Sequence, residues 1–484
     1  MVLASNETRY EVLSSDDLQH LLACSRETDP ERPLYFDFHD GAIDLCGPMH
    51  GADIQRRFHY VHGYPGRIHP WIPMYLLGMD AMSCVPGPVI DPFSGTGTIP
   101  LESLINPVHP KSALAMEINP LAALITRVKT HPIRFQPVEE LIARVQDRYY
   151  GERSSDDVIE NSRLVTFWYS GKAISQLSRL KAAIESCTDL GTCAQDFLRL
   201  AFYSVCRSSS RADPRIAPPV VLKKRNYSQS KESLRRVSAQ LNRMKDPPVF
   251  SMFESTVKTN YNRLYALSAH EPFWNEVVNA ETLEGDCCTL LRERFGSSDR
   301  STPGSISRGK AHLLVTSPPY LTAQKYIRSS KLQLVWMGYS EEQIRRLDRH
   351  SIGTELCAFR SEQVVPLLPL SVSSLVERTA ARSEERARSV QNYFEGMLRF
   401  FSAAHDSLAS DGAVVLITGD NSVCGEPVAT HALLADCAES VGLRQVLTVA
   451  NDIKNHSMMT CRNRTSDVIR TEYVTWFKCT SHSP

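Results

Sequence analysis

Two short apolar runs, each followed by a loop of small or rigid residues, limit most strongly what this chain can fold into. The first begins at Val89 and reads VIDPFSGTGT to Thr98, and the second begins at Val315 and reads VTSPPY to Tyr320. Short apolar runs bounded by turn residues are typical of buried strands. Glycines directly after such a strand let a ligand approach the backbone closely. We therefore expect both strands to end in loops with a binding or catalytic role.

Strand and helix signals alternate around the first loop. Val89-Ile90 predicts a strand, 98–105 a helix with Pro100 in its first turn, 113–116 a strand that ends at Glu117, and the chain to about 129 another helix. Further strands are predicted at 282–286, 312–315, 413–417, 445–449 and 473–477, with helices from about 70–73 and over 390–408. This alternation is typical of a doubly wound, Rossmann-like α/β sheet.

The 484 residues exceed one typical domain, so we expect one large core with a substantial insertion. Residues 1–56 are polar and show no clear element. The ranges 57–130 and 281–484 carry the sheet pattern, and 131–280 has mostly helical apolar spacing. The stretch after the second loop and the segment 299–310 read as irregular, the latter as a surface loop.

Composition narrows the functional classes. Lys+Arg 54 balance Asp+Glu 54, so a nucleic-acid partner would need a local basic face. The 13 cysteines include no CxxC pair, which favours free thiols over a zinc site or a disulfide framework. No secretory signal pattern and no membrane-spanning apolar run is seen in the sequence. We therefore expect a cytoplasmic protein without a metal or a membrane partner.

The first loop suits a nucleoside-bearing cofactor. Gly95 and Gly97 lie where a strand gives way to a helix, so backbone N–H groups can point at a ligand. The dinucleotide pattern G-x-G-x-x-G is not met because Pro100 occupies its third glycine position, which argues against a nicotinamide dehydrogenase. Glu117 lies about 20 residues further on, at the end of the next strand, where an acidic side chain accepts hydrogen bonds from ribose hydroxyls. The alternative is that the glycines only make a tight turn.

Together the two loops resemble motifs I and IV of the S-adenosylmethionine-dependent amino-methyltransferases that modify DNA bases. The resemblance implies a methyltransferase sheet with a cofactor-binding half at 57–130 and a catalytic half at 281–484. It also implies a cofactor site formed by Asp91, Pro92, Phe93, Ser94, Gly95, Thr96, Gly97, Thr98, Glu117 and Asp286. The aromatic stretch from His59 to Pro73 is similar to motif X, although core packing is the alternative.

The second loop suits transfer of a methyl group to an exocyclic amine. The Ser317 hydroxyl and the Pro318 carbonyl can accept the amine hydrogens, Pro318 and Pro319 stiffen the backbone, and Tyr320 offers a face for an extruded base. Without a Pro-Cys dipeptide in the loop, carbon-5 cytosine chemistry is not supported. In the resembled family a serine at the first position is typical of cytosine-N4 enzymes. A plain proline turn is the alternative.

Basic residues follow the second loop and also interrupt the insertion. Lys325, Arg328 and Lys331 interleave with Tyr326 and Trp336, ahead of Arg345, Arg346, Arg349 and His350. This pattern suits phosphate contacts and an intercalated wedge, or else an amphipathic helix with a solvated basic face. The insertion has a second candidate DNA surface from Arg207 to Arg225 and is the candidate target-recognition region.

The leading hypothesis is a site-specific DNA (cytosine-N4-) methyltransferase that binds double-stranded DNA, with a possible restriction or defence-system partner. An adenine-N6 DNA methyltransferase or an RNA amino-methyltransferase would share the same loops. A binding module that kept the fold without catalysis is a third class.

Overall fold

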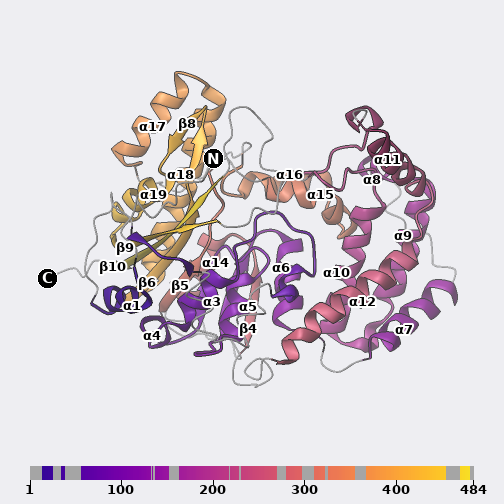
Figure 1. The fold of residues 1–484 in the computed structure, drawn as a ribbon, viewed down its shortest axis with the longest axis horizontal. Coiled ribbons are helices and arrows are strands. Elements are labelled where there is room, and N and C mark those ends of the chain that lie inside the picture. Colours follow the sequence, from indigo (N-terminus) through magenta and orange to yellow (C-terminus); the bar gives the residue numbers. More distant parts are fainter. Residues whose placement is uncertain are drawn as a thin grey trace.

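The computed structural model describes residues 13–24, 34–38, 56–131, 133, 137–151, 163–216, 218–227, 230–269, 279–296, 310–321, 325–354, 367–453 and 469–479. Within them a mixed sheet of 8 strands has the order β1-β9-β10-β6-β5-β2-β3-β4 (Figure 1). The strands are β1 (Leu34–Tyr35), β2 (Val89–Asp91), β3 (Ala113–Glu117), β4 (Ala280–Glu284), β5 (Ala311–Thr316), β6 (Leu408–Gly419), β9 (Leu443–Asp452) and β10 (Thr471–Cys479). A separate hairpin pairs β7 (Asn421–Val423) with β8 (Glu426–Val428). The predicted α/β fold is confirmed at this level.

Strands β4, β3, β2, β5 and β6 run parallel, whereas β10 lies antiparallel between β6 and β9. The chain goes from β2 outward through β3 to β4, and then returns to place β5 on the other side of β2. The strand order therefore reverses between β2 and β5. In open α/β sheets the carboxyl ends of strands at such a reversal form the usual ligand crevice.

Side chains alternate along the strands and fill two cores. Leu313 and Val315 of β5 pack in one core with α3 (Trp71–Gly78), while Leu314 packs in the other with α14 (Cys287–Phe295) and α18 (Glu384–Ser407). Unbroken burial of β5 from Leu313 to Thr316 fits a strand covered on both faces. The helices around the sheet also include α1 (Ser15–Cys24), α4 (Asp80–Ser83), α5 (Thr98–Leu104), α6 (Pro120–Thr130), α17 (Leu370–Ala380) and α19 (Thr430–Glu439).

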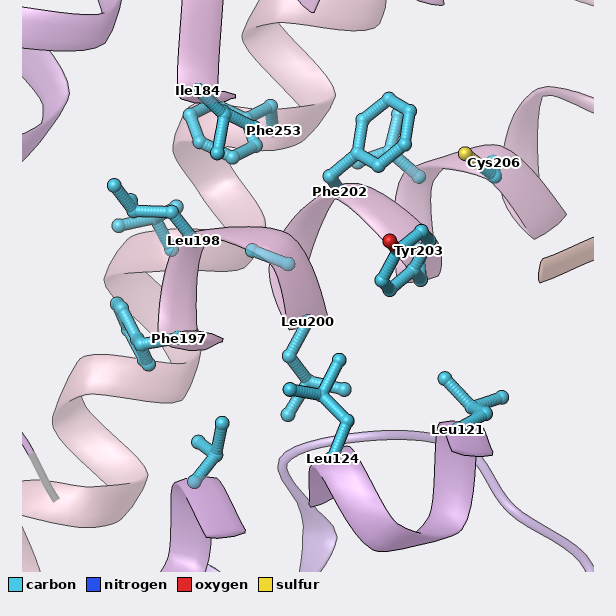
Figure 2. Close-up of a cluster of buried hydrophobic side chains, with 14 of the residues drawn as sticks. Leu121, Leu124, Ile184, Phe197, Leu198, Leu200, Phe202, Tyr203, Cys206 and Phe253 are labelled. Carbon is cyan, nitrogen blue, oxygen red and sulfur yellow. The ribbon is translucent and has the colours of Figure 1, made fainter. Parts of the chain in front are cut away.

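A third core joins the chain between α6 and β4 to the sheet. This part of the chain forms α7 (Val138–Gly151), α8 (Arg163–Trp168), α9 (Gly171–Glu185), α10 (Thr192–Ser209), α11 (Lys231–Arg243) and α12 (Val249–Tyr265), which lie to the right of the sheet in Figure 1. All of them except α11 contribute to the third core, and Val237 of α11 packs in a smaller cluster with Leu222. Figure 2 shows Leu200 of α10 directed toward Leu124 of α6, with Phe197 and Leu198 on the same helix among the other buried side chains. Each such buried side chain contributes about 1.5–3 kcal/mol.

The structure has elements in two segments where the sequence shows no clear pattern or reads as irregular. The N-terminal 56 residues contain α1 and the two-residue strand β1, which pairs with β9. The stretch after the second loop contains α15 (Tyr326–Trp336) and α16 (Glu341–His350) in addition to α17. The predicted surface loop at 299–310 lies outside the described residues except for Lys310.

Candidate functional site

The carboxyl ends of three neighbouring strands lie at the point where the strand order reverses. Residues 92–97, which we call the glycine loop, follow β2; Glu117 ends β3; and residues 317–320, the Ser-Pro-Pro-Tyr corner, follow β5. Because β2 pairs with both β3 and β5, the sheet brings together the loops that the sequence singled out.

The two glycines of the glycine loop have different surroundings. Gly95 and Gly97 adopt left-handed φ values of 52° and 69°. A Cβ added at Gly95 would meet nothing nearer than the Phe93 carbonyl oxygen at 4.0 Å, whereas one at Gly97 would come within 2.6 Å of Thr126 Cγ2. A side chain at Gly97 would therefore clash with α6 of the protein itself. Gly97 allows packing against α6, and Gly95 faces the open side.

Glu117 holds the glycine loop in place. Its Oε2 accepts a 2.8 Å hydrogen bond from Gly95 N, and its Oε1 accepts one of 2.8 Å from Asn119 N. Burial raises the pKa of Glu117 to about 7, against the opposing effect of these backbone donors. Each oxygen retains a second lone pair, so the carboxylate can still accept hydroxyl groups.

Asp91 lies beneath the loop and joins it to the corner. The side chain is 1% exposed, and its Oδ1 accepts a 2.6 Å hydrogen bond from Thr316 Oγ1. Phe93 N donates to the same Oδ1 at 3.3 Å. Burial raises the pKa of Asp91 to about 7. Asp91 therefore has a positioning role in this structure and does not face an open ligand site.

The remaining residues of the predicted cofactor site occupy the surroundings of the loop. The Phe93 ring packs on Phe400 of α18 with centroids 4.9 Å apart. Thr98 opens α5. Further along the sheet, Asp286 caps α14 through a 3.1 Å bond from Thr289 N, and Gly285 N donates to the Glu117 carbonyl at 2.9 Å. Asp286 is thus next to the end of β3. Pro92, Ser94 and Thr96 complete the loop.

The Ser-Pro-Pro-Tyr corner is anchored by a residue that the sequence reasoning missed. Tyr320 Oη donates to Glu472 Oε1 at 3.1 Å, and Glu472 is 5% exposed at the start of β10. Burial raises the pKa of Glu472 to about 7, and burial also raises the pKa of Tyr320 well above its usual value. Ser317 is half-buried and its side chain partly opposes the shift at Tyr320. The one sequence feature that could have pointed to Glu472 is its position as a lone carboxylate at the start of an apolar strand.

The aromatic stretch 59–73 contacts the site through one hydrogen-bonded asparagine. Asn119 Nδ2 donates to Tyr64 Oη at 2.9 Å and to Ser330 Oγ at 3.0 Å. Tyr64 stacks on Tyr326 with ring centroids 6.3 Å apart. Asn119 directly follows the Glu117 turn, so this stretch lies at the edge of the site.

The basic segment after the corner differs from the predicted wedge. Trp336 is 0% exposed and packs edge-on against Tyr169 and Phe202, so it is a core residue and cannot intercalate. Arg328 is paired with Asp348 at 3.0 Å. Most of α15 is buried, so it has no solvated basic face. In α16, by contrast, Arg345, Arg346 and Arg349 are exposed, which fits the alternative of an amphipathic helix. In the insertion, Lys223 and Lys224 are exposed, and a DNA contact there stays a prediction.

Among the described residues, no group of three His, Cys, Asp or Glu side chains is placed to hold a metal ion. No helix in the described ranges is both long and apolar enough to traverse a lipid bilayer. Comparison of the chain with protein-family models, curated proteins and solved structures found no match.

Proposed function

We propose that this protein is an S-adenosylmethionine-dependent DNA methyltransferase that acts on the exocyclic N4 amine of a flipped-out cytosine in duplex DNA. One observation carries the proposal. The glycine loop and the Ser-Pro-Pro-Tyr corner follow adjacent parallel strands, and the Thr316–Asp91 hydrogen bond of 2.6 Å joins them. A cofactor loop and an amine-binding corner must lie this close if a methyl group is to pass between their ligands.

The residues around the glycine loop fit the cofactor. If the parallel strands β2, β3, β4, β5 and β6 are numbered 1 to 5 along the chain, their order in the sheet is 3-2-1-4-5, as in nucleotide-binding α/β sheets. The glycine loop lies where this order reverses. Gly95 leaves open space in front of its backbone, and Glu117 retains lone pairs for ribose hydroxyls. Asp286 lies one strand further out, where the base of a bound nucleoside would extend. When bound, S-adenosylmethionine supplies an electrophilic methyl group.

The corner fits the acceptor amine. The Ser317 hydroxyl and the Pro318 carbonyl would accept the amine hydrogens and make its nitrogen more electron-rich. Two consecutive prolines keep these acceptors from relaxing away. The hydrogen bond to Glu472 fixes the Tyr320 ring, so a base can stack on it without first ordering the side chain. Stacking of this kind contributes about 1–3 kcal/mol per base.

Methyl transfer in solution tests the proposal. Purified protein is incubated with S-adenosylmethionine that carries a tritiated methyl group and with either duplex DNA or RNA. We expect the unaltered protein to transfer tritium to the DNA and the Ser317→Ala variant to transfer none. Calorimetry should show that Ser317→Ala still binds S-adenosylmethionine. Labelling of RNA alone would favour the RNA amino-methyltransferase alternative. No labelling of either substrate by a protein that binds S-adenosylmethionine would contradict the proposal.

A further inference from the structure

A cavity of about 720 Å³ lies beside the proposed active site, between the sheet and the helical insertion. Its walls come from the loop 59–71, the end of α10, residues 212–215 and α15. The glycine loop, Glu117 and the Ser-Pro-Pro-Tyr corner do not line it, although Thr98, the residue after Gly97, does. The cavity is therefore a neighbour of the site and is large enough for a ligand of its own.

The lining of this cavity carries positive charge from three arginines. Arg67, Arg207 and Arg215 contribute to it, and no Asp or Glu is among its described lining residues. Two carboxylates lie behind the wall. Glu102 contacts His59 at 2.7 Å but is also paired with Arg56 at 2.9 Å. Asp213 lies 3.4 Å from Arg215. The arginines thus outnumber the carboxylates, and the cavity favours an anion.

Part of the hydrogen-bonding capacity of the lining is unused. Arg207 Nη1 is buried without a hydrogen-bond partner in the described ranges, while Arg207 Nη2 donates to the Ile216 carbonyl at 2.6 Å. Neither ring nitrogen of His62 has a partner that meets hydrogen-bond geometry among the described residues. Burial lowers the pKa of His62 to about 4, and the nearby Gly63 backbone only partly opposes this. A neutral His62 and a charged Arg207 therefore both keep unused hydrogen-bonding capacity in the wall of the cavity.

A short chain of contacts connects the cavity to the proposed site. Tyr64 and Ser330 line the cavity, and both accept hydrogen bonds from Asn119 Nδ2. Asn119 N in turn donates to Glu117. An anion in the cavity would thus lie one layer of side chains away from the residues assigned to the cofactor.

We propose that this cavity holds a backbone phosphate of the DNA strand that carries the flipped base, an inference that rests on the proposed function. Flipping rotates the target nucleotide out of the duplex and presents its flanking phosphodiesters to the enzyme. A guanidinium binds a phosphate through two parallel N–H donors, and Arg67, Arg207 and Arg215 offer such donors around one space. The carboxylate of the cofactor is the other anion that could occupy the cavity.

The test compares two arginines, one at the cavity and one away from it. Arg207 lines the cavity, whereas Arg163 is exposed, does not line it and lies outside the two candidate DNA-binding segments. Binding of Arg207→Gln and Arg163→Gln to a duplex with mismatched cytosines, which flip more easily, is measured by fluorescence anisotropy over a range of salt concentrations. Arg207→Gln should bind about 5- to 10-fold more weakly, with a salt slope lower by about 1, because one phosphate contact is lost. Arg163→Gln should match the unaltered protein.

Arg215→Gln is the second variant, because Arg207 also bonds the Ile216 carbonyl and its loss could disturb the fold. Calorimetry with S-adenosylmethionine, run on each variant, separates the two anions. Unchanged salt slopes for both Arg207→Gln and Arg215→Gln would overturn the inference, as would weaker S-adenosylmethionine binding with normal DNA binding. Equal losses in Arg207→Gln and Arg163→Gln would also overturn it in favour of a general basic surface. Failure of the unaltered protein to bind S-adenosylmethionine would instead count against the proposed function.

Discussion

Thr316 Oγ1 donates a 2.6 Å hydrogen bond to Asp91 Oδ1, and so joins the last residue of β5 to the last residue of β2. Thr316 also accepts a 3.1 Å bond from Phe93 N. Both side chains are buried, at 0% and 1% exposure. The loops that follow these two strands are the two from which the proposed chemistry arises, so their relative position depends on this pair.

Removing the Thr316 hydroxyl should therefore weaken the fold. Thr316→Val keeps the shape of the side chain but leaves the buried Asp91 carboxyl with one donor fewer. The free energy of unfolding should fall by about 1–3 kcal/mol, measured by urea denaturation. Thr316→Ser retains the hydroxyl and is the matched control. Its free energy of unfolding should fall by less than about half of the decrease in Thr316→Val. Equal free energies of unfolding for Thr316→Val and the unaltered protein would show that this hydrogen bond makes no net contribution to stability.

The buried Asp91 should also make stability depend on pH. Burial raises its pKa from 3.8 to about 7, so the folded state holds a proton that the unfolded state has lost. The contribution of Asp91 to the free energy of unfolding therefore falls as pH rises from about 4 through about 7. Asp91→Asn removes this decline and should gain on the order of 4 kcal/mol relative to the unaltered protein over that interval. Asp80→Asn, at an exposed carboxyl, is the control for loss of one charge. A constant difference between Asp91→Asn and the unaltered protein would contradict this account.

The two glycines of the glycine loop should respond differently to the same substitution. Gly95→Ala places a methyl group in open space, so the protein should fold at a cost of about 1–2 kcal/mol for the left-handed backbone. Its affinity for S-adenosylmethionine should drop at least about 10-fold, a change of about 1.4 kcal/mol. Gly97→Ala meets Thr126 at 2.6 Å and should lower the thermal midpoint further. Calorimetric binding and thermal unfolding of both variants test this, and a reversed order would be evidence against the placement of the cofactor.

Tyr320 should act through its ring in base capture and through its hydroxyl in stability. Tyr320→Phe keeps the stacking face and should retain methyl transfer, but it removes the donor to Glu472 and should cost about 1–3 kcal/mol of stability. Tyr320→Ala should lose transfer, with partial recovery on a mismatched target whose base flips more easily. Turnover on matched and mismatched duplexes distinguishes the two variants. Similar turnover for both would mean that no base stacks on Tyr320.

The main strands could be predicted because each contains a short apolar run followed by turn residues. Val89-Ile90, 113–116 and 413–417 all lie within observed strands, as do 445–449 and 473–477. By contrast, β1 has two residues, too few for any periodicity, and depends on pairing with β9. Local signals cannot show a strand that long-range pairing alone stabilises.

Contacts between distant segments explain most of what the sequence reasoning missed in the candidate site. Glu472 lies 152 positions from Tyr320, and Asn119 lies 211 positions from Ser330. Neither contact could be predicted from the types of the residues involved. The same limit made Trp336 look like a DNA wedge, because basic neighbours surround it in sequence while Tyr169 and Phe202 bury it in space.

The modified base itself tests the central claim most directly. DNA from cells that express the unaltered protein, or Ser317→Ala as the control, is digested to nucleosides and analysed by mass spectrometry. The account predicts N4-methylcytosine in the first sample and none in the second. N6-methyladenine in place of N4-methylcytosine, or no methylated nucleoside while purified protein binds S-adenosylmethionine, would contradict it.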